Sequence, residues 1–246
     1  KPEILFWVGC AGSLDDRAQV VSKSLARLMQ IAGIQFAILG NEEACTGDPA
    51  RRSGNEFLFQ MLAQQNIQTL DNYGVKRIVT ACPHCFNTLK NEYPELGGQY
   101  EVVHHVQLLD ELLEKGKIPL SSPGREVVTY HDSCYMGRVN GIYDAPRNIL
   151  KHLRVELKEM PRCGSNGLCC GAGGAQMFKE EESGDRRVNR ERVDEAIRTG
   201  ATTIAANCPF CITMLEDGLK AGQGQQAAMV HDLSELILKN LNDQTT

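Results

Sequence analysis

Two stretches of this chain decide its fold: KRIVTACPHC at residues 76–85 and TTIAANCPFC at residues 202–211. In each stretch a short apolar run ends in a Cys-Pro-x-Cys sequence. An apolar, β-branched run is typical of a buried strand, and a proline directly after it is typical of the first turn of a helix. The chain therefore carries the same strand, cysteine and helix unit twice.

The remaining cysteines extend this repeat over the whole sequence. Cys10 and Cys134 are 124 residues apart, as are Cys45 and Cys169, whereas Cys82 and Cys85 recur 126 residues later as Cys208 and Cys211. Four cysteines that recur at one offset indicate an internal duplication. The halves meet at IPLSSPG, residues 118–124, which is rich in residues that break regular structure. We expect a first lobe at 1–119 and a second lobe at 120–246.

Short apolar runs alternate with stretches of helical periodicity in both halves. Strands are predicted at residues 4–8, 34–39, 75–80, 100–103, 127–130, 155–159, 202–206 and 228–230, and helices at 18–31, 55–73, 86–92 and 180–198. The last helix has the alternating charges of a salt-bridged surface helix. The prediction is an α/β fold of two tandem pseudo-symmetric lobes, each a small, mostly parallel sheet flanked by helices. The cysteines then follow strand ends, where open parallel sheets bind ligands.

Composition excludes several classes of protein. With 246 residues, 42% of them hydrophobic, the chain can bury a core of ordinary size, and its formal net charge of -5 argues against a nucleic-acid partner. No stretch approaches the ~20 apolar residues of a membrane-spanning helix, and no signal peptide is present. The chain begins Lys1-Pro2 without a methionine, so we expect a fragment or processed form. We expect a cytoplasmic location, peripheral to the inner face of the cell membrane through a partner or a missing N-terminal region.

The ten cysteines admit three interpretations. A disulfide framework suits small secreted domains, and this chain is large and has no export signal. Zinc would use each Cys-x-x-Cys as a half-site, but the two pairs lie in different halves and the adjacent Cys169 and Cys170 would have no role. Iron–sulfur clusters use thiolates from dispersed positions and are the favoured interpretation.

The residues around the cysteines fit an anionic cluster. Each proline of a Cys-Pro-x-Cys sequence places a helix N-terminus, with its N–H groups and positive dipole, beside the thiols. The glycine-rich run at residues 164–174 allows backbone amides to point at cluster sulfur. A dinucleotide-binding loop is the alternative for this run, but that loop needs a strand directly before it.

The two halves differ in their number of thiolates. The second half offers five with adjacent Cys169 and Cys170, which suggests an unusual cluster with an extra or bridging thiolate. The first half has Cys45-Thr46-Gly47 at the equivalent place, and its four thiolates predict a cubane cluster.

These motifs resemble a known family. Each half has a cysteine, then Cys-Cys-Gly or, in the first half, Cys-Thr-Gly, and then Cys-Pro-x-Cys. This order resembles the cysteine-rich CCG domain of heterodisulfide reductase, in its B-type and D-type polypeptides, and of related iron–sulfur oxidoreductases. The sequences CTGDPARRSGNE at residues 45–56 and YHDSCY at residues 130–135 resemble the C-terminal part of the electron-transferring-flavoprotein:(methyl)menaquinone oxidoreductase branch. That branch is fused to a membrane cytochrome-b-like region and a ferredoxin-like domain.

The resemblance implies an iron–sulfur oxidoreductase subunit or fragment that passes electrons between a flavoprotein or ferredoxin-like donor and a quinone. It implies a noncubane [4Fe-4S] cluster in the second lobe, held by Cys134, Cys169, Cys170, Cys208 and Cys211. Cys10, Cys45, Cys82 and Cys85 would hold a four-cysteine [4Fe-4S] cluster in the first lobe. Thr46 departs from the motif, because threonine is a poor ligand for soft metals. Two alternatives remain: a heterodisulfide-type reductase that cleaves a disulfide at the noncubane cluster, and a non-redox zinc scaffold.

Other residues have candidate roles in or near these sites. His131, followed by Asp132, is a candidate catalytic residue, because an imidazole oriented by a carboxylate can carry protons. His84 is expected either to hydrogen-bond cluster sulfur or to be exposed at a helix start. Cys163 lies outside the repeat and is interpreted as a spare thiol in a loop. Arg51 and Arg52 are interpreted as a solvated helix face, with docking of an acidic partner as the alternative.

Overall fold

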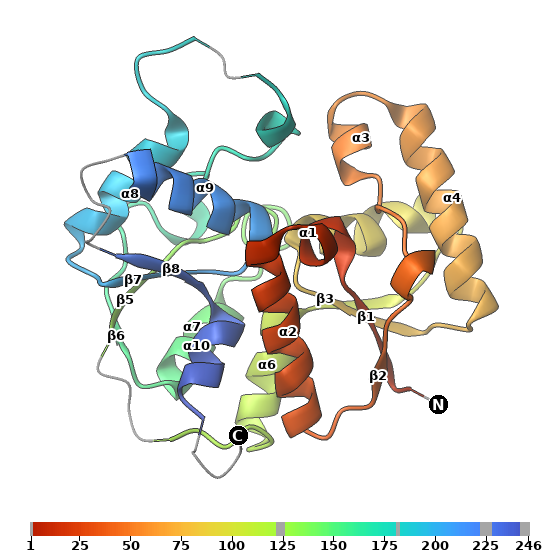
Figure 1. The fold of residues 1–246 in the computed structure, drawn as a ribbon, viewed down its shortest axis with the longest axis horizontal. Helices are drawn as coiled ribbons and strands as arrows, with labels where there is room; N and C mark the ends of the chain where they lie inside the picture. The colour runs from red at the N-terminus through yellow and green to blue at the C-terminus, as the bar shows by residue number, and fades with distance from the viewer. Residues whose placement is uncertain (1, 122–125, 181–182, 222–227, 242–246) are drawn as a thin grey trace.

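The computed structural model describes residues 2–121, 126–180, 183–221 and 228–241, and within them the chain forms two parallel four-stranded sheets (Figure 1). The first sheet has the order β2-β1-β3-β4 and the second β6-β5-β7-β8. The strands are β1 (Ile4–Trp7), β2 (Phe36–Ala37), β3 (Arg77–Thr80), β4 (Glu101–His104), β5 (Val127–Tyr130), β6 (Glu156–Leu157), β7 (Thr203–Ala206) and β8 (Met229–Asp232). This confirms the predicted α/β fold with two lobes and parallel sheets.

Helices flank both sheets. The helices of the first lobe are α1 (Gly9–Leu14), α2 (Asp16–Ile31), α3 (Asp48–Arg52), α4 (Glu56–Asn72), α5 (Pro83–Asn87) and α6 (His105–Glu114). Those of the second lobe are α7 (Asp144–His152), α8 (Val188–Arg198), α9 (Pro209–Ala221) and α10 (Leu233–Lys239). No helix among the described residues is both long and apolar enough to cross a membrane.

Local sequence explains these elements. All four residues of β1 and of β7 are buried, as expected for parallel strands covered by helices on both faces. The side chain of Asp15 caps α2 by accepting a hydrogen bond from the backbone N–H of Ala18, and Asn55 caps α4 in the same way. The proline after Cys82 and the one after Cys208 each open a helix, as predicted.

Several predicted boundaries were wrong, and the strand predicted at residues 155–159 is limited to Glu156–Leu157. The strand predicted at residues 34–39 is limited to Phe36–Ala37, and the helix predicted at 86–92 begins at Pro83 and continues as a π-helix, Thr88–Glu92. The helix predicted from residue 180 begins at Val188, because Arg187 is extended and Ser183-Gly184 favour irregular backbone; residues 181–182 lie outside the described part.

The helix α8 also differs from the predicted surface helix in its burial. The side chains of Arg192 and Glu195 are buried, with 0% and 4% of their surface exposed. Charge alternation alone could not distinguish these two residues from the exposed charges around them.

Helices of the two lobes pack against each other. The last helix of each lobe packs on the first long helix of the other, α6 on α7 and α10 on α2, and these four helices lie between the two sheets (Figure 1). One apolar cluster therefore spans both lobes, and its buried members include Leu28, Met29, Leu108, Leu109, Ile149, Leu150, Leu236 and Ile237.

Polar contacts of His105 and of Arg17 also join the lobes. His105 Nε2 lies 3.0 Å from Asp232 Oδ1, and the two side chains are 0% and 1% exposed. Arg17 on α2 donates to Glu216 and to Glu235 at 2.7 and 2.8 Å. The boundary between residues 119 and 120 stays a prediction, and residues 122–124 of the expected linker lie outside the described part.

Candidate functional site

Both cysteine clusters lie at the switch point of a sheet. In the first sheet β1 and β3 are neighbours, and the chain continues from β1 to β2 on one side and from β3 to β4 on the other. The crevice that this arrangement leaves at the carboxyl ends of the two central strands is the usual ligand site of open parallel sheets. Cys10 follows β1 and Cys82 follows β3, and Cys134 and Cys208 follow β5 and β7 in the same way.

The first lobe brings its four predicted cysteines together. One pocket is lined by Cys10, Cys45, Cys82 and Cys85. A hydrogen bond from Cys45 lowers the pKa of Cys10 to about 6 against the opposing effect of burial, while the same contact raises the pKa of Cys45. Contact with Cys82, together with burial, holds the pKa of Cys85 well above its usual value. These pKa shifts reflect thiols that contact one another. A metal cluster bound there would hold them as thiolates.

The second lobe brings together all five of its predicted cysteines. A continuous series of thiol contacts runs through Cys134, Cys169, Cys170, Cys211 and Cys208. Hydrogen bonds from Cys134 and Cys170 lower the pKa of Cys169 strongly, and burial opposes this effect. The adjacent pair Cys169 and Cys170 therefore reaches the same site, with Cys170 on the side of Cys211.

A glycine follows the repeated cysteine in each lobe and directs its backbone N–H at the sulfur. Gly47 donates to Cys45 Sγ at 3.4 Å, and Gly171 donates to Cys169 Sγ at 3.3 Å. Their φ values are +88° and +95°, a region in which a side chain would be strained. Backbone donors to sulfur are typical of iron–sulfur sites, so the glycine-rich backbone and the soft thiolate sets fit clusters of this kind.

Thr46 occupies the position of Cys170 in the first lobe. Its side chain is 2% exposed, and Thr46 Oγ1 donates toward Cys85 Sγ at 3.8 Å. Cys170 contacts Cys211, the equivalent of Cys85, in the second lobe. The first site is thus built like the second, with a hydroxyl at the place of the fifth thiol.

The third residue of each Cys-Pro-x-Cys sequence contacts the cysteine site of the other lobe. Phe210 from the second lobe lines the first-lobe pocket, and His84 from the first lobe hydrogen-bonds Cys208 of the second. Their ring centroids are 5.1 Å apart, and His84 also stacks on Tyr135 with a centroid distance of 4.2 Å. The two cysteine sites therefore adjoin each other across one layer of aromatic rings.

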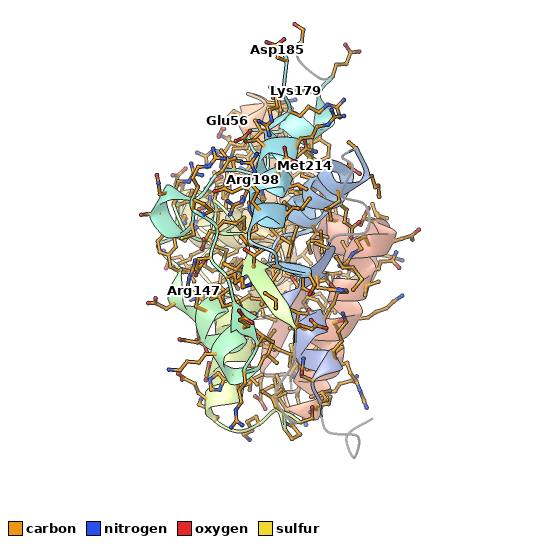
Figure 2. All side chains as sticks on the ribbon, turned by 90° about the vertical axis from the view of Figure 1, so that its left-hand side faces the viewer. Glu56, Arg147, Lys179, Asp185, Arg198 and Met214 are labelled. Atoms are coloured by element: carbon orange, nitrogen blue, oxygen red, sulfur yellow. The ribbon has the colours of Figure 1, made fainter. Side chains whose placement is uncertain are left out.

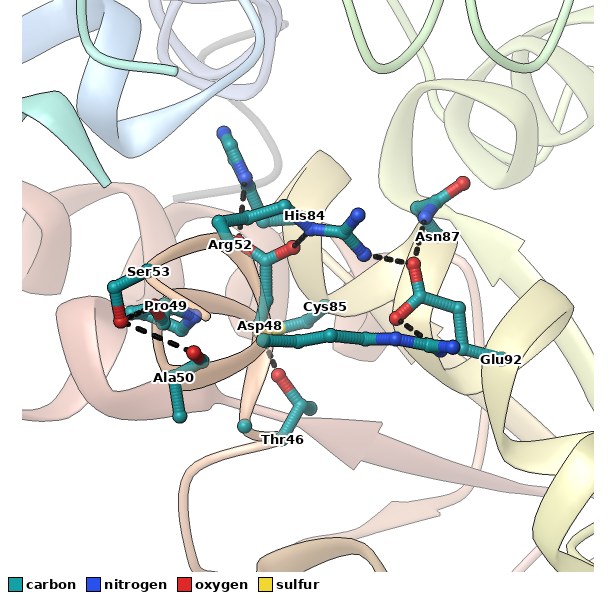
Figure 3. A network of polar contacts seen from close by, with 12 residues as sticks. Thr46, Asp48, Pro49, Ala50, Arg52, Ser53, His84, Cys85, Asn87 and Glu92 are labelled. Carbon is teal, nitrogen blue, oxygen red and sulfur yellow. Dashed lines mark hydrogen bonds and ion pairs between the residues drawn. The ribbon is translucent and has the colours of Figure 1, made fainter. Parts of the chain in front are cut away.

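His84 is held by an acidic partner that sequence reasoning missed. It is buried, contrary to the alternative of an exposed ring, and His84 Nδ1 lies 2.9 Å from Asp48 Oδ2 (Figure 3). Burial opposes protonation, but Asp48 and Cys208 together raise the pKa of His84 to about 11. Complete burial acts to raise the pKa of Cys208, but Cys211 and His84 hold it well below its usual value. A charged network therefore runs from Asp48 through His84 to the second-lobe thiols.

Arg51 and Arg52 are not a solvated helix face. Arg52 donates to Asp48 Oδ1 at 3.1 Å and also pairs with Glu92 (Figure 3). Arg51 donates to Glu92 Oε2 at 3.0 Å. Both guanidinium groups are half-buried; Arg52 fixes the carboxylate that holds His84, and Arg51 shares Glu92 with Arg52. The helix start at Asp48, directly after Cys45-Thr46-Gly47, was the only sequence signal for this network.

His131 reaches the second-lobe site, but the predicted pair with Asp132 does not form. Asp132 instead accepts hydrogen bonds from Arg147 at 2.9 Å and from the backbone N–H of Gly164 at 2.7 Å. His131 accepts a hydrogen bond from Arg192 Nε at 2.9 Å, and its ring nitrogen lies within 4.8 Å of the sulfurs of Cys170 and Cys211. Burial and the nearby guanidinium lower the pKa of His131 to about 3.

Cys163 lies apart from the thiol network. Burial and then Glu159 raise its pKa, and no thiol is among the groups that act on it. The described residues between Cys170 and α8, 171–180 and 183–187, project from the molecule, with Asp185 near the outer end (Figure 2). The described part of this projection places Phe178 against Phe210, with ring centroids 6.0 Å apart.

Comparison with curated proteins finds iron–sulfur oxidoreductases. The chain is 45% identical over 243 residues to the EtfAB:quinone oxidoreductase of Syntrophomonas wolfei and 48% identical over 240 residues to the probable iron-sulfur-binding oxidoreductase FadF of Bacillus subtilis. These alignments cover 96% and 97% of this chain and 34% of each relative, so the chain spans about a third of their length. It is also 33% identical over 253 residues to one polypeptide of the dihydromethanophenazine:CoB–CoM heterodisulfide reductase of Methanosarcina barkeri, covering 100% of this chain and 61% of that protein.

A solved structure shares the fold. A hypothetical protein from Helicobacter pylori superposes with a TM-score of 0.64 at 13% identity, over 100% of this chain and 51% of that one. The model of the cysteine-rich domain family CCG matches residues 4–90 and 128–216, one segment in each lobe. The chain therefore belongs to the CCG cysteine-rich domain family and carries that domain twice.

Proposed function

We propose that this chain is the iron–sulfur electron-transfer module of an oxidoreductase. In the second lobe Cys134, Cys169, Cys170, Cys208 and Cys211 would hold a noncubane [4Fe-4S] cluster. In the first lobe Cys10, Cys45, Cys82 and Cys85 would hold a four-thiolate [4Fe-4S] cluster. When bound, such clusters supply one-electron oxidation and reduction. The donor would be a flavoprotein or a ferredoxin-like domain, the acceptor a quinone.

The observation that carries this proposal is the adjacency of the two cysteine sites. Each site is built at the switch point of its own sheet, and the rings of His84 and Phe210 contact both sites. A zinc scaffold needs no such proximity, whereas electron transfer between two centres does. The names of the relatives, which include EtfAB:quinone and iron-sulfur-binding oxidoreductases, support the same choice.

The residues around the sites have definable tasks in this function. The thiolates hold iron, and the backbone N–H groups of Gly47 and Gly171 stabilise negative charge on sulfur. The His84 imidazolium adds a positive charge beside Cys208. Each of these groups favours the reduced, more negative state of a cluster and so raises its reduction potential.

The first-lobe site has the more open approach for a partner. Cys10 is exposed, and a cavity of about 630 Å³ beside Cys10 and Cys45 is partly lined by the apolar side chains of Leu14 and Ile38. Cys134, the equivalent of Cys10 in the second lobe, is only partly exposed. We infer that the outer end of the electron path lies at the first lobe.

A heterodisulfide-type reductase is the second candidate, and one observation favours it. A cavity of about 360 Å³ lies between the lobes, lined on one side by Cys45 and Leu58 and on the other by Ala175 and Phe178. A thiol substrate bound there would change the electron paramagnetic resonance spectrum of a nearby cluster. Thr46 argues against this candidate, because it leaves the first lobe one thiolate short of the second.

Redox titration of the anaerobically purified chain, followed by electron paramagnetic resonance, tests the proposal. We expect two iron–sulfur signals with different potentials and a magnetic interaction between them, because the sites adjoin. Spectra that change on addition of a thiol would favour the reductase, and a colourless protein without a signal would exclude both redox functions.

A further inference from the structure

His131 occupies a fixed place at the second-lobe site. It directly follows β5, and its backbone N–H donates to the carbonyl of Ala205 on β7 at 2.8 Å. β5 and β7 are also the strands whose ends carry Cys134 and Cys208. The side chain is 0% exposed, so the ring has no access to water.

Arg192 determines which nitrogen of this ring carries the proton. Arg192 Nε lies 2.9 Å from His131 Nδ1, and both side chains are 0% exposed. A guanidinium group can only donate hydrogen bonds, so Nδ1 must be the acceptor. A neutral imidazole then carries its single proton on Nε2.

Arg192 is itself held in place by two further contacts. Its Nη1 donates to the carbonyl of Arg162 at 2.8 Å and to Glu195 Oε2 at 3.1 Å. Glu195 is 4% exposed and also accepts the backbone N–H of Arg162 at 2.7 Å. The guanidinium is thus oriented by groups other than the histidine it contacts.

The Nε2–H group of His131 has no hydrogen-bond partner among the described residues. Buried N–H groups almost always have one, because burial without a partner is costly. One nitrogen of the ring lies within 4.8 Å of both Cys170 Sγ and Cys211 Sγ, so the ring lies close to the place where cluster sulfur would lie, and Nε2 is the nitrogen that Arg192 leaves without a partner. A protonated Nε2 has no free lone pair for a metal, which excludes it as a ligand in this state.

The first lobe carries a comparable group at the same place. Trp7 lies at the end of β1, 124 positions before His131, and its buried Nε1–H also has no partner among the described residues. An indole N–H can donate a hydrogen bond but cannot carry a proton between partners. A buried ring N–H at both positions favours a donor role over a proton-carrying or ligand role.

We propose that His131 donates a hydrogen bond from Nε2–H to a sulfur atom of the second-lobe cluster, and that Arg192 is the positioning residue that fixes the required tautomer. This inference rests on the proposed iron–sulfur function. A hydrogen bond to cluster sulfur stabilises the reduced cluster, so the donor raises the reduction potential of the second-lobe cluster relative to one without it.

Electron–nuclear double resonance tests the donor role, and all of these spectra are recorded on anaerobically purified chains that carry His84→Phe, because His84 is the other imidazole beside the second-lobe thiols. With ¹⁵N-labelled histidine, a hydrogen bond gives a weak nitrogen coupling and a proton coupling that disappears in deuterated water. A strong nitrogen coupling would mean that His131 ligates iron, and the absence of both couplings would mean no contact; either result overturns the inference.

Variants then test the effect on the potential. His131→Phe should lower the reduction potential of the second-lobe cluster and remove both couplings, and His131→Gln, which keeps an N–H donor, should restore part of the shift. Arg192→Leu should weaken the couplings while His131 is intact. His152→Phe, at the end of α7 and away from the thiols, is the matched control.

Iron and acid-labile sulfide are measured on every sample. A parent chain without them would overturn the proposed function together with the inference. Clusters that are present but keep the parent potential in both His131 variants would overturn the inference alone.

Discussion

The ring of His84 lies 5.1 Å from the ring of Phe210, centroid to centroid, and each of the two residues contacts the cysteine site of the opposite lobe. They are the corresponding residues of the two Cys-Pro-x-Cys sequences. The duplicated motif thus supplies the thiols of its own lobe and one side chain of the neighbouring site. Because each site includes a side chain from the opposite lobe, the two sites form one assembly.

The variant His84→Phe tests what the charge of His84 contributes to the second-lobe site. It gives the first lobe the residue that the second lobe has at the equivalent position, Phe210. Because the imidazolium beside Cys208 is lost, we expect a lower reduction potential for the second-lobe cluster and unchanged iron content. Redox titration followed by electron paramagnetic resonance measures the shift. Removal of an exposed charge by Arg198→Ala, at the end of α8 (Figure 2), should have no such effect. Equal potentials in His84→Phe and parent would contradict the assigned role.

Thr46→Cys tests the equivalence of Thr46 and Cys170. The Thr46 side chain points toward Cys85 at 3.8 Å and is 2% exposed, so a cysteine of similar size would place a fifth thiolate in the first-lobe site. We expect the spectrum of the first-lobe cluster to approach that of the second. Thr46→Ser keeps the hydroxyl and should leave the spectrum unchanged. An unaltered spectrum in Thr46→Cys would show that position 46 does not reach iron.

The variants Cys170→Ala and Cys163→Ala distinguish a cysteine that binds the cluster from one that does not. Cys170 belongs to the series of contacting thiols, whereas no thiol acts on Cys163. We expect Cys170→Ala to change the visible and electron paramagnetic resonance spectra of the second-lobe cluster and Cys163→Ala to preserve them. If both variants keep the parent spectrum, the assignment of five thiolates is wrong.

Arg17 and Glu235 form a contact between the lobes. This contact should contribute measurably to the free energy of unfolding. Burial opposes ionisation of Glu235, but the nearby ring of His231, 3.6 Å away, and a hydrogen bond from Arg17 outweigh it and lower the pKa of Glu235 from 4.5 to about 2. This contribution to the free energy of unfolding is therefore complete above about pH 5 and is lost as pH falls through about 2. Glu235→Gln should flatten the pH dependence of stability in that window.

Arg17→Met should lower the free energy of unfolding at neutral pH by on the order of 1–3 kcal/mol, because it leaves partly buried carboxylates without their partner. Denaturant titration measures this change. Lys115→Ala is the matched control, since Lys115 pairs with Glu111 at the surface with 60% of its side chain exposed, and such pairs contribute about 0–1 kcal/mol. Equal losses in both variants would contradict a specific role of Arg17 between the lobes.

The sequence predicted the parts of this site that depend on spacing along the chain. The repeat of Cys10, Cys45, Cys82 and Cys85 identified the duplication, and strand ends placed the thiols at the switch points because cysteines follow apolar runs. The same reasoning made Thr46 the equivalent of Cys170. These features require only the order of elements and the topology of a parallel sheet.

The remaining parts depend on tertiary packing. Arg192 lies in a charged run that is typical of a surface helix, and only the packing of α8 brings it to His131. Asp132 adjoins His131 in sequence, yet successive residues point in different directions and Asp132 pairs with Arg147 instead. The contact of His84 with the second lobe depends on how the two lobes pack against each other, which no local pattern encodes.

Iron, acid-labile sulfide and zinc, measured on one sample of the anaerobically purified chain, test the central claim most directly. Two clusters of the [4Fe-4S] type predict roughly eight iron and eight sulfide per chain. Roughly four of each would mean that the first-lobe site is not occupied. Zinc in place of iron, without sulfide, would contradict the account of this chain as an electron-transfer module.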